Sequence, residues 1–331
     1  MRVAGAWTGR ELVVFGRGTT REPWRRNIAA AYDPLTRRWR KLAPPAGQPG
    51  SLEGRYDAVW TGHEVVVWGP DTVLAYSPDR NRWRRLPKPP TGHGFAVWTG
   101  REVIGWGGGC CGDANADGSA YDPARNRWRR LPRAPLPPGQ QPTGVWTGKE
   151  LLVFGVRRPD GPPLRAAAAY DPARNRWRRI APIPAPRYGA VAVWDGREAL
   201  VAGGTSGATL PHTGFAYAPA TNRWRALPPM ETPRFGAAGV WTGRELLLWG
   251  GASGSKAGEV PPHGLAYDPR KNRWSSLPQA PLVGRSYPVG AWTGRSFLVW
   301  GGSAGVCAPD GVHGCRTKVF ADGAGFTPAP R

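Results

Sequence analysis

The sequence has few cysteines, few acidic residues and no long hydrophobic run. Only 4 Cys and 2 Met occur in 331 residues, and 23 Asp plus Glu stand against 45 Lys plus Arg, for a formal net charge of +22. No segment approaches the roughly 20 consecutive apolar residues of a transmembrane helix, so we expect no membrane span. Only six of the basic residues are lysines, and an arginine excess of this kind does not by itself indicate a nucleic-acid partner.

Glycine, proline and tryptophan are abundant instead. The chain contains 47 Gly, 37 Pro and 18 Trp, and 40% of its residues are hydrophobic. Gly and Pro interrupt helices and long strands, whereas the apolar residues are numerous enough to form a core. The composition therefore favours many short β-strands.

Two phrases alternate along the whole chain. The first, Trp-Thr/Asp-Gly, begins at seven tryptophans: Trp7, Trp60, Trp98, Trp146, Trp194, Trp241 and Trp292. The second is close to Ala-Tyr-Asp-Pro-x-x-Asn-Arg-Trp-Arg-x-Leu and occurs six times, for example over residues 120–131. Because the repeats leave no remainder, we expect a single domain over residues 1–331.

Each repeat predicts four strands. Small residues such as those of 189–193 precede the first-phrase Trp and suit a crowded innermost strand. The run 246–250 is hydrophobic throughout, as in a second strand buried on both faces. The third strand ends at Tyr-Asp-Pro, a turn sequence. The fourth, as in 127–131, alternates charged and apolar residues, which is typical of an outer edge strand.

These residues resemble the kelch repeat, with its small first strand, aliphatic-Gly-Gly second strand, Tyr-Asp third strand and Trp-x-x-Leu fourth strand. The resemblance covers residues 2–328 and implies an all-β, seven-bladed β-propeller of four-stranded antiparallel blades. Galactose oxidase is the best-known enzyme on this fold. The expected blades span about 2–42, 55–87, 93–132, 142–181, 187–228, 234–278 and 285–331.

The last blade lacks its fourth strand in this chain. Residues 323–328 match the third-strand segment 264–269 position by position, but no Trp-x-x-Leu follows them. We expect the natural protein to carry such a strand, and any secretion signal, upstream of Met1, since an unpaired edge is a liability. The alternative is a genuine three-stranded blade.

Candidate binding residues open the first strands. The strand order places the variable loops, which join second to third strands and successive blades, on one face. Three arginines stand seven residues before a first-phrase Trp and Arg55 stands five residues before Trp60, each close to an aromatic residue. They should ring the channel mouth on this face, where guanidinium groups suit acidic or sugar ligands. The candidates are Arg55, Tyr56, Arg187, Tyr188, Arg234, Phe235, Arg285 and Tyr287. Alternatively, each arginine pairs with the neighbouring blade.

All four cysteines fall in variable loops. We expect a Cys307–Cys315 disulfide, and a vicinal Cys110–Cys111 bridge as a second candidate, which together indicate an oxidising, extracytoplasmic location. A metal site that includes His313 is the rival interpretation, but the spacing matches no zinc pattern.

One loop resembles the first half of a calcium loop. Asp113, Asn115 and Asp117 precede Gly118 at the required spacing, whereas the twelfth position is Ala124 instead of Glu. The three residues are a calcium candidate, and a polar turn is the alternative. No other cofactor is expected.

For function, the sequence favours a non-enzymatic binding or scaffold protein. Most glutamates lie in the short turns, and no copper-binding pair of tyrosines and histidines can be carried over from galactose oxidase. We expect a monomer with an acidic protein, peptide or glycan partner. A galactose-oxidase-like or other carbohydrate-active enzyme is the first alternative. Binding of nucleic acid or another anionic polymer through the basic rim is the second.

Overall fold

A computed structural model of the chain consists of β-strands, turns and loops. It describes residues 3–17, 27–44, 56–69, 72–92, 94–109, 113–159, 161–254, 260–307 and 315–329. Among these residues, none belongs to a helix that is long and apolar enough to cross a membrane. The strands divide between two compact units, an N-terminal unit of residues 2–161 and 166–179 and a C-terminal unit of residues 162–165 and 180–331.

The N-terminal unit holds four sheets of four antiparallel strands, paired in sequence order. Blade 1 consists of β1 (Ala4–Trp7), β2 (Leu12–Arg17), β3 (Asn27–Asp33) and β4 (Arg38–Lys41); blade 2 of β5 (Asp57–Trp60), β6 (Val65–Trp68), β7 (Val73–Ser77) and β8 (Arg82–Arg85); blade 3 of β9 (Ala96–Trp98), β10 (Val103–Trp106), β11 (Gly118–Asp122) and β12 (Arg127–Arg130); blade 4 of β13 (Thr143–Trp146), β14 (Leu151–Phe154), β15 (Ala168–Asp171) and β16 (Arg176–Arg179).

The C-terminal unit holds the other three blades and one hairpin. Blade 5 consists of β17 (Tyr188–Trp194), β18 (Ala199–Thr205), β19 (Phe215–Ala218) and β20 (Arg223–Ala226); blade 6 of β21 (Ala238–Trp241), β22 (Leu246–Trp249), β23 (His263–Asp268) and β24 (Arg273–Gln279); blade 7 of β25 (Val289–Trp292), β26 (Phe297–Trp300) and β29 (Gly323–Phe326); the hairpin of β27 (Ser303–Cys307) and β28 (Cys315–Val319).

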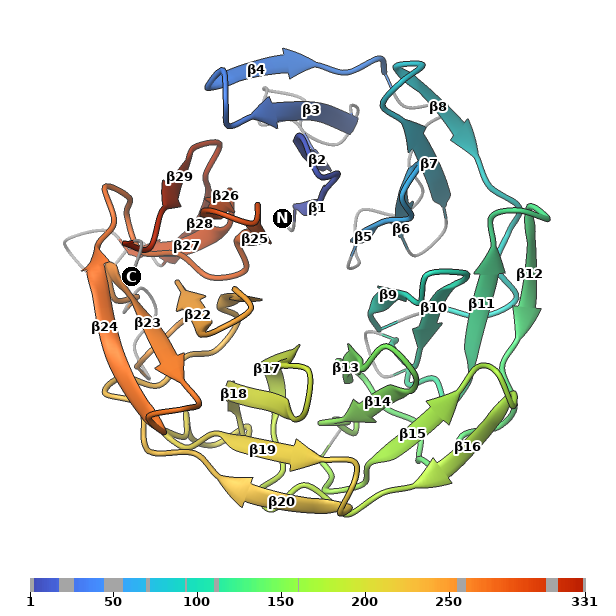
Figure 1. Cartoon of the computed structure of the whole chain (residues 1–331), viewed down its shortest axis with the longest axis vertical. Helices are drawn as coiled ribbons and strands as arrows, with labels where there is room; N and C mark the ends of the chain where they lie inside the picture. The colour runs from blue at the N-terminus through green and yellow to red at the C-terminus, as the bar shows by residue number, and fades with distance from the viewer. Residues whose placement is uncertain are drawn as a thin grey trace. The chain divides into compact units, whose positions relative to one another are not determined.

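The predicted fold class, a seven-bladed β-propeller with an incomplete last blade, is confirmed. Six sheets have four strands, and blade 7 has the order β25-β26-β29. Within each unit the first strands of successive blades contact one another, as β5 contacts β9 and β17 contacts β21, and the fourth strands form the outer edge (Figure 1). The assignment of the small-residue strand to the innermost position is therefore also confirmed.

The repeated phrases form the two turns of each blade. In blade 3, Thr99 Oγ1 accepts a hydrogen bond from the Glu102 amide at 2.9 Å, and Gly100 between them has a φ of +89°. At the other turn, Asp122 Oδ1 accepts from the Ala124 amide at 3.0 Å, and Asn126 has a φ of +49°. Gly and Asn tolerate such positive φ values. These residues therefore allow the tight turns that join the first strand to the second and the third strand to the fourth.

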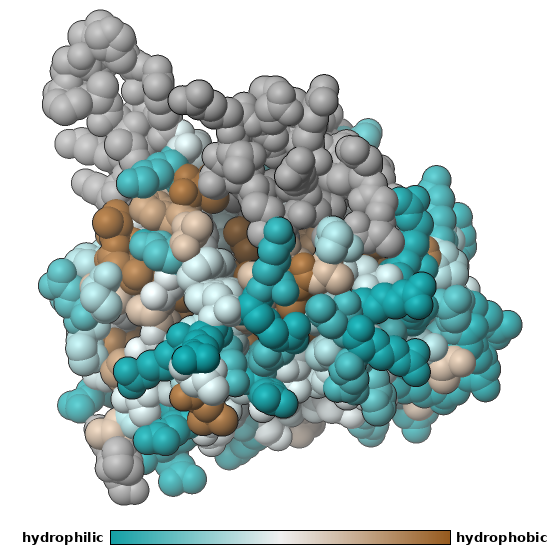
Figure 2. All heavy atoms as spheres, turned by 90° about the horizontal axis from the view of Figure 1, so that it is seen from above, coloured by the Kyte–Doolittle hydropathy of each residue, from teal (hydrophilic) through white to brown (hydrophobic). Residues whose placement is uncertain are grey.

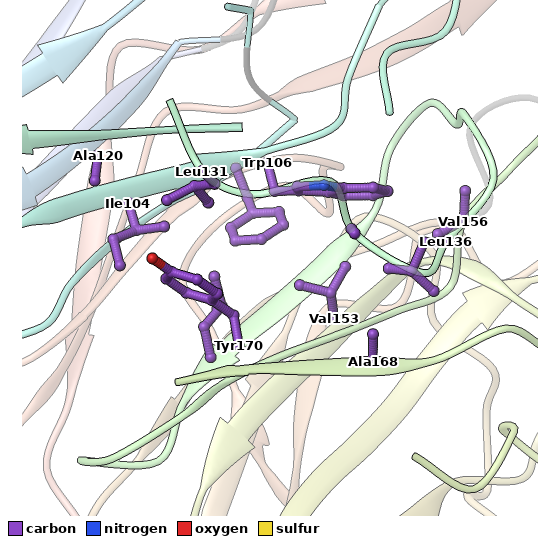
Figure 3. Close-up of a cluster of buried hydrophobic side chains, with 12 residues drawn as sticks. Ile104, Trp106, Ala120, Leu131, Leu136, Val153, Val156, Ala168 and Tyr170 are labelled. Carbon is purple, nitrogen blue, oxygen red and sulfur yellow. The ribbon is translucent and has the colours of Figure 1, made fainter. Parts of the chain in front are cut away.

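The core lies between neighbouring blades. Every residue of β6, β10, β14 and β22 is buried, as the continuous hydrophobic runs predicted. Between blades 3 and 4, Trp106 and Leu131 face Val153 and Tyr170 across the sheet interface (Figure 3). These second strands are therefore covered on both faces.

Candidate functional site

The candidate arginines of the C-terminal unit are buried. Arg187, Arg234 and Arg285 open the first strands of blades 5, 6 and 7, at the end of the blade where the variable loops begin. Each has only 1% of its surface exposed. This differs from the expected ring of guanidinium groups at the channel mouth, because the side chains turn back into their own blades.

The guanidinium groups bond mainly to carbonyl groups of their own blades. Arg187 Nη1 donates to the Gly203 carbonyl at 3.2 Å and also to the Thr213 carbonyl. Arg234 Nη2 donates to the His263 carbonyl at 3.0 Å. These carbonyls lie where second strands end and third strands begin, and a buried carbonyl needs a donor. The arginines therefore connect second and third strands, which neither sequence interpretation had proposed.

Arg285 differs because it has a carboxylate partner. Its Nη1 donates to Asp322 Oδ1, its Nη2 lies 3.4 Å from Asp322 Oδ2, and its Cζ lies 3.9 Å from the ring centroid of Phe320. The hydrogen bond from Arg285 holds the pKa of Asp322 below its usual value. This ion pair ties the first strand of blade 7 to the segment before β29.

The main chain of these arginines docks on the preceding blade. The Arg234 carbonyl accepts a hydrogen bond from the Gly204 amide at 2.7 Å. A Cβ atom on Gly203 would lie 2.2 Å from that carbonyl oxygen. The Arg285 carbonyl accepts from Gly251 in the same way, at 2.9 Å. The Gly-Gly pairs at the ends of second strands are therefore required for the close approach of neighbouring blades.

Next to the buried arginines, three aromatic rings form a continuous row, the aromatic ladder of Tyr188, Phe235 and Tyr287. The Tyr188 and Phe235 rings meet edge to face with centroids 5.8 Å apart, and Phe235 and Tyr287 repeat this arrangement at 5.8 Å. All three are half-buried. The ladder is thus a partly exposed apolar strip of blades 5 to 7 that opens on the variable-loop face.

The buried arginines next in sequence to the ladder residues carry positive charge. Burial lowers the pKa of Arg187 and of Arg234 to about 10, so both guanidinium groups stay protonated at neutral pH. Their hydrogen-bond acceptors are carbonyl groups and the Thr213 hydroxyl, which do not neutralise a full charge, and the charge of Glu231 acts on Arg234. Blades 5 and 6 therefore each hold a covered positive charge next in sequence to a ladder residue.

The two remaining candidates for the channel mouth, Arg55 and Tyr56, belong to the N-terminal unit. Tyr56 packs against Phe15 with ring centroids 5.5 Å apart, and a Cβ atom on Gly69 would lie 2.2 Å from the Tyr56 ring. Arg55 lies outside the described residues. Tyr56 is therefore placed like the ladder residues, as a ring packed at the opening of a first strand.

The calcium candidate residues are engaged in contacts between blades 3 and 4. The Asp113 carbonyl accepts from Gln140 Nε2 at 2.8 Å, and the Asn115 carbonyl accepts from the Gly139 amide at 3.0 Å. Asp117 lies 3.6 Å from Arg130. Among the described residues, no group of three His, Cys, Asp or Glu side chains is arranged to hold a metal ion. Calcium binding stays a prediction.

For the predicted Cys307–Cys315 disulfide, the structure describes the backbone positions of both residues. Cys307 and Cys315 are directly opposed in the register of the β27–β28 hairpin. Directly opposed residues of antiparallel strands have Cα atoms about 4.5–5.5 Å apart, which a disulfide can span. Cys110, Cys111 and His313 lie outside the described residues.

Sequence reasoning missed the partners of the outer-strand arginines. Arg129 of β12 donates to both carboxylate oxygens of Glu102 at 2.9 and 2.6 Å, and its Nη1 reaches the hydroxyl of Tyr170 in the next blade at 3.0 Å. We call this arrangement the rim network. Its Arg–Glu pair recurs as Arg40–Glu11, Arg84–Glu64, Arg178–Glu150 and Arg225–Glu198. A sequence signal for this network was present. The Glu of the short turn and the Arg directly after the fourth-strand Trp recur together in the same blades.

Other outer-strand arginines lie outside the rim network and are exposed, although Arg130 still contacts Asp117 and the Pro90 carbonyl. Arg127 and Arg130 of β12, and Arg176 and Arg179 of β16, are exposed. In the face shown in Figure 2, hydrophilic residues predominate and hydrophobic ones are scattered among them. The basic rim thus consists of exposed arginines that alternate with arginines held in the rim network.

Comparisons with known proteins agree with this geometry. The family model described as the KLHDC2/KLHL20/DRC7 Kelch-repeats domain matches residues 92–302. A solved structure of a fungal alcohol oxidase of the AA5 family, in complex with copper, is similar over 96% of this chain and 72% of that chain, with a TM-score of 0.70 and 14% identity. Identity this low shows the shared fold alone. No curated protein matches the chain. Since the family model covers more than half of its residues, the chain belongs to the kelch-repeat family.

Proposed function

We propose that this protein is a non-enzymatic binding protein that holds an acidic polypeptide segment on the variable-loop face of the C-terminal unit. The observation that supports this best is the aromatic ladder, in which Tyr188, Phe235 and Tyr287 present half-buried rings in series. Half-buried rings on a rigid scaffold supply apolar contact at low entropic cost. A kelch propeller provides such a scaffold.

The charge of the buried arginines favours an acidic partner. Arg187 and Arg234 are protonated and buried, so their field acts through the ladder and not through direct contact with a carboxylate. Field effects of this kind raise association rates and select the sign of the ligand charge. The aromatic rings would then supply the contact area, and the arginines the preference for negative charge. A glycan with acidic groups meets the same two requirements.

Binding of a labelled peptide of four Glu-Pro-Leu repeats tests this proposal. Phe235→Ala removes the central ring of the ladder, and we expect it to weaken binding at least tenfold at 150 mM salt, about 1.4 kcal/mol. Leu35→Ala, at an 88% exposed position in the N-terminal unit, is the matched control and should leave binding unchanged. Equal binding by both variants would contradict the proposal.

We further propose an extracytoplasmic location and a Cys307–Cys315 disulfide. The support is the register of the β27–β28 hairpin, which opposes the two residues directly. Mass spectrometry of the native protein after alkylation, with and without reductant, tests this. A cross-linked peptide pair containing Cys307 and Cys315 is the expected result, and four free thiols in freshly isolated protein would refute it.

The oxidase alternative rests on fold similarity alone. The fungal structure contains copper and is described as an alcohol oxidase, but at 14% identity its chemistry does not transfer to this chain. We therefore keep binding as the proposed function.

A further inference from the structure

A groove with a volume of about 540 Å³ lies between blades 3 and 4, at the strand ends that carry the short turns. It is formed by the β9–β10 turn and Arg129 of blade 3 together with both short turns of blade 4, β13–β14 and β15–β16. We call it the turn groove. A hollow of this size can hold a small organic ligand. The proposed function uses the strand ends where first strands open, so the turn groove is a separate surface.

Both carboxylates that line the turn groove already have partners. Glu102 accepts hydrogen bonds from Arg129 Nε and Nη2 at 2.9 and 2.6 Å through its two oxygens. Asp171 Oδ1 accepts from the Ala173 amide at 2.9 Å, and Asp171 Oδ2 accepts from Arg174 Nη1 at 2.7 Å. The charge of each acid is therefore matched by one arginine.

Two further cations of the turn groove have no such match. Arg101 and Lys149 line it, are exposed, and make no side-chain hydrogen bond or ion pair with any residue that the structure describes. Arg174 also lines the groove, and its side chain stays 69% exposed although it pairs with Asp171. The groove therefore has two positive charges in excess and a third guanidinium group open to solvent.

This set of cations is particular to one blade boundary of the N-terminal unit. Three positions define it: the residue after the turn Gly in each of the two blades, and the residue before the turn Asn in the second blade. At the boundary between blades 3 and 4 these are Arg101, Lys149 and Arg174. The boundaries between blades 1 and 2 and between blades 2 and 3 both have His63 at one of the positions. The turn groove is therefore more basic than the repeat alone requires.

Trp146 gives the turn groove an aromatic face. It is the last residue of β13 and pairs in register with Leu151. Its half-buried ring packs against the core between blades 3 and 4 and also lines the groove. An indole held in this way, next to Arg and Lys side chains, is the combination on which a nucleic-acid base stacks while its phosphate meets positive charge.

We propose that the turn groove binds a nucleoside phosphate, as a free nucleotide or as part of a single strand. The base stacks on Trp146, and the phosphate accepts hydrogen bonds from Arg101 and Lys149. A terminal phosphate has about two negative charges and three acceptor oxygens near neutral pH, which match the two excess cations better than one carboxylate does. The site does not involve the aromatic ladder, so this proposal and the proposed function can fail separately.

ATP binding to the chain of residues 1–331, measured by calorimetry at about 150 mM salt, tests the cations. Arg101→Ala combined with Lys149→Ala should weaken ATP binding at least tenfold. The matched control combines Arg10→Ala with Arg244→Ala, at the same turn position of blades 1 and 6, and removes the same charge. It should change the affinity less than about twofold. Equal weakening by both double variants would show that net charge alone attracts ATP and would overturn the proposal.

Tripolyphosphate, which has the charge of ATP without the base, tests the ring. We expect the unmodified chain to bind ATP at least tenfold more tightly than tripolyphosphate. In Trp146→Leu this difference should disappear while tripolyphosphate binding stays the same, a pattern that a general loss of structure would not produce. Equal affinity of the unmodified chain for the two ligands would contradict the proposal, even if Trp146→Leu does not fold.

A single strand of eight thymidines distinguishes the two sources of the ligand. If it displaces ATP, and the Arg101→Ala and Lys149→Ala pair weakens its binding too, the groove takes a nucleotide within a strand. If ATP binds and the strand does not displace it, the groove takes a free nucleotide. Either result supports a nucleoside phosphate as the ligand. Binding of neither ATP nor the strand at about 1 mM would refute the proposal.

Discussion

At the scale of single residues, arginine has three different roles in this protein. Arg187 is buried and bonds to main-chain carbonyls, Arg129 belongs to the rim network, and Arg127 is exposed on the same strand as Arg129. The phrase Arg-Trp-Arg-Arg does not distinguish the role of Arg129 from that of Arg127, and Arg187 lies outside this phrase, at the start of the first strand of blade 5. The contacts that each side chain makes in the folded chain separate the three roles.

The rim network should contribute measurably to stability. Glu102→Gln removes the charge that Arg129 pairs with and leaves its bonds to Tyr170 and Asn175 in place. We expect the free energy of unfolding to fall by about 1–3 kcal/mol, the range for a hydrogen bond to a charged group. Arg125→Ala breaks the exposed Arg125–Asp122 pair and should cost less than about 1 kcal/mol. Urea denaturation measures both, and equal losses would refute the assignment.

The Arg285–Asp322 pair should make stability depend on acid pH. The hydrogen bond from Arg285 lowers the pKa of Asp322 in the folded chain. A carboxyl group of this kind stabilises the fold above its unfolded pKa of about 4, and the contribution disappears as the pH falls through the lowered folded value. Asp322→Asn should therefore cost on the order of 1 kcal/mol at pH 6 and little at pH 3.

Urea midpoints of both proteins between pH 3 and pH 7 measure this effect. Asp79→Asn, at an exposed position of the N-terminal unit, is the control and should run parallel to the wild type. A difference between Asp322→Asn and wild type that persists unchanged at pH 3 would contradict the prediction.

At the scale of elements, each blade is held by turns that its own residues specify and by contacts that only the neighbouring blade provides. The Thr99–Glu102 turn and the Asp122 turn are local, and both were predicted from residue types. The Gly-Gly pairs depend on the neighbouring blade, since the Arg234 carbonyl approaches Gly203 and Gly204 from blade 6. The Gly-Gly motif could be seen in the sequence, but the close approach of the next blade that requires it could not.

Two glycines with similar backbone conformations should respond differently to substitution. Gly203 has a φ of +70° and faces the Arg234 carbonyl oxygen, whereas Gly243 has a φ of +90° and open space around it. Gly243→Ala should cost about 1 kcal/mol from backbone strain. Gly203→Ala should cost about 2 kcal/mol more, because its methyl group collides with the next blade. Thermal unfolding compares them, and equal losses would show that the close approach is unimportant.

At the scale of the whole molecule, the net charge of +22 should produce salt-dependent binding to polyanions that does not involve the aromatic ladder. A 20-base-pair DNA duplex should bind at 50 mM salt and lose most of its affinity by 300 mM, as counterion release requires. Changing Arg127, Arg130, Arg176 and Arg179 together to Gln should weaken this binding and leave binding of the acidic peptide intact. Parallel loss of both would mean that the rim is the ligand site.

Repetition in the sequence by itself determined the number of blades, the strand order and the turn residues. These follow from periodicity and local turn chemistry, which act over a few residues. The tertiary structure alone decided that Arg187, Arg234 and Arg285 are buried and that Tyr188, Phe235 and Tyr287 form a ladder. Burial and ring contacts depend on atoms that neighbouring blades bring together from some 40 to 50 residues apart, and no local pattern encodes them.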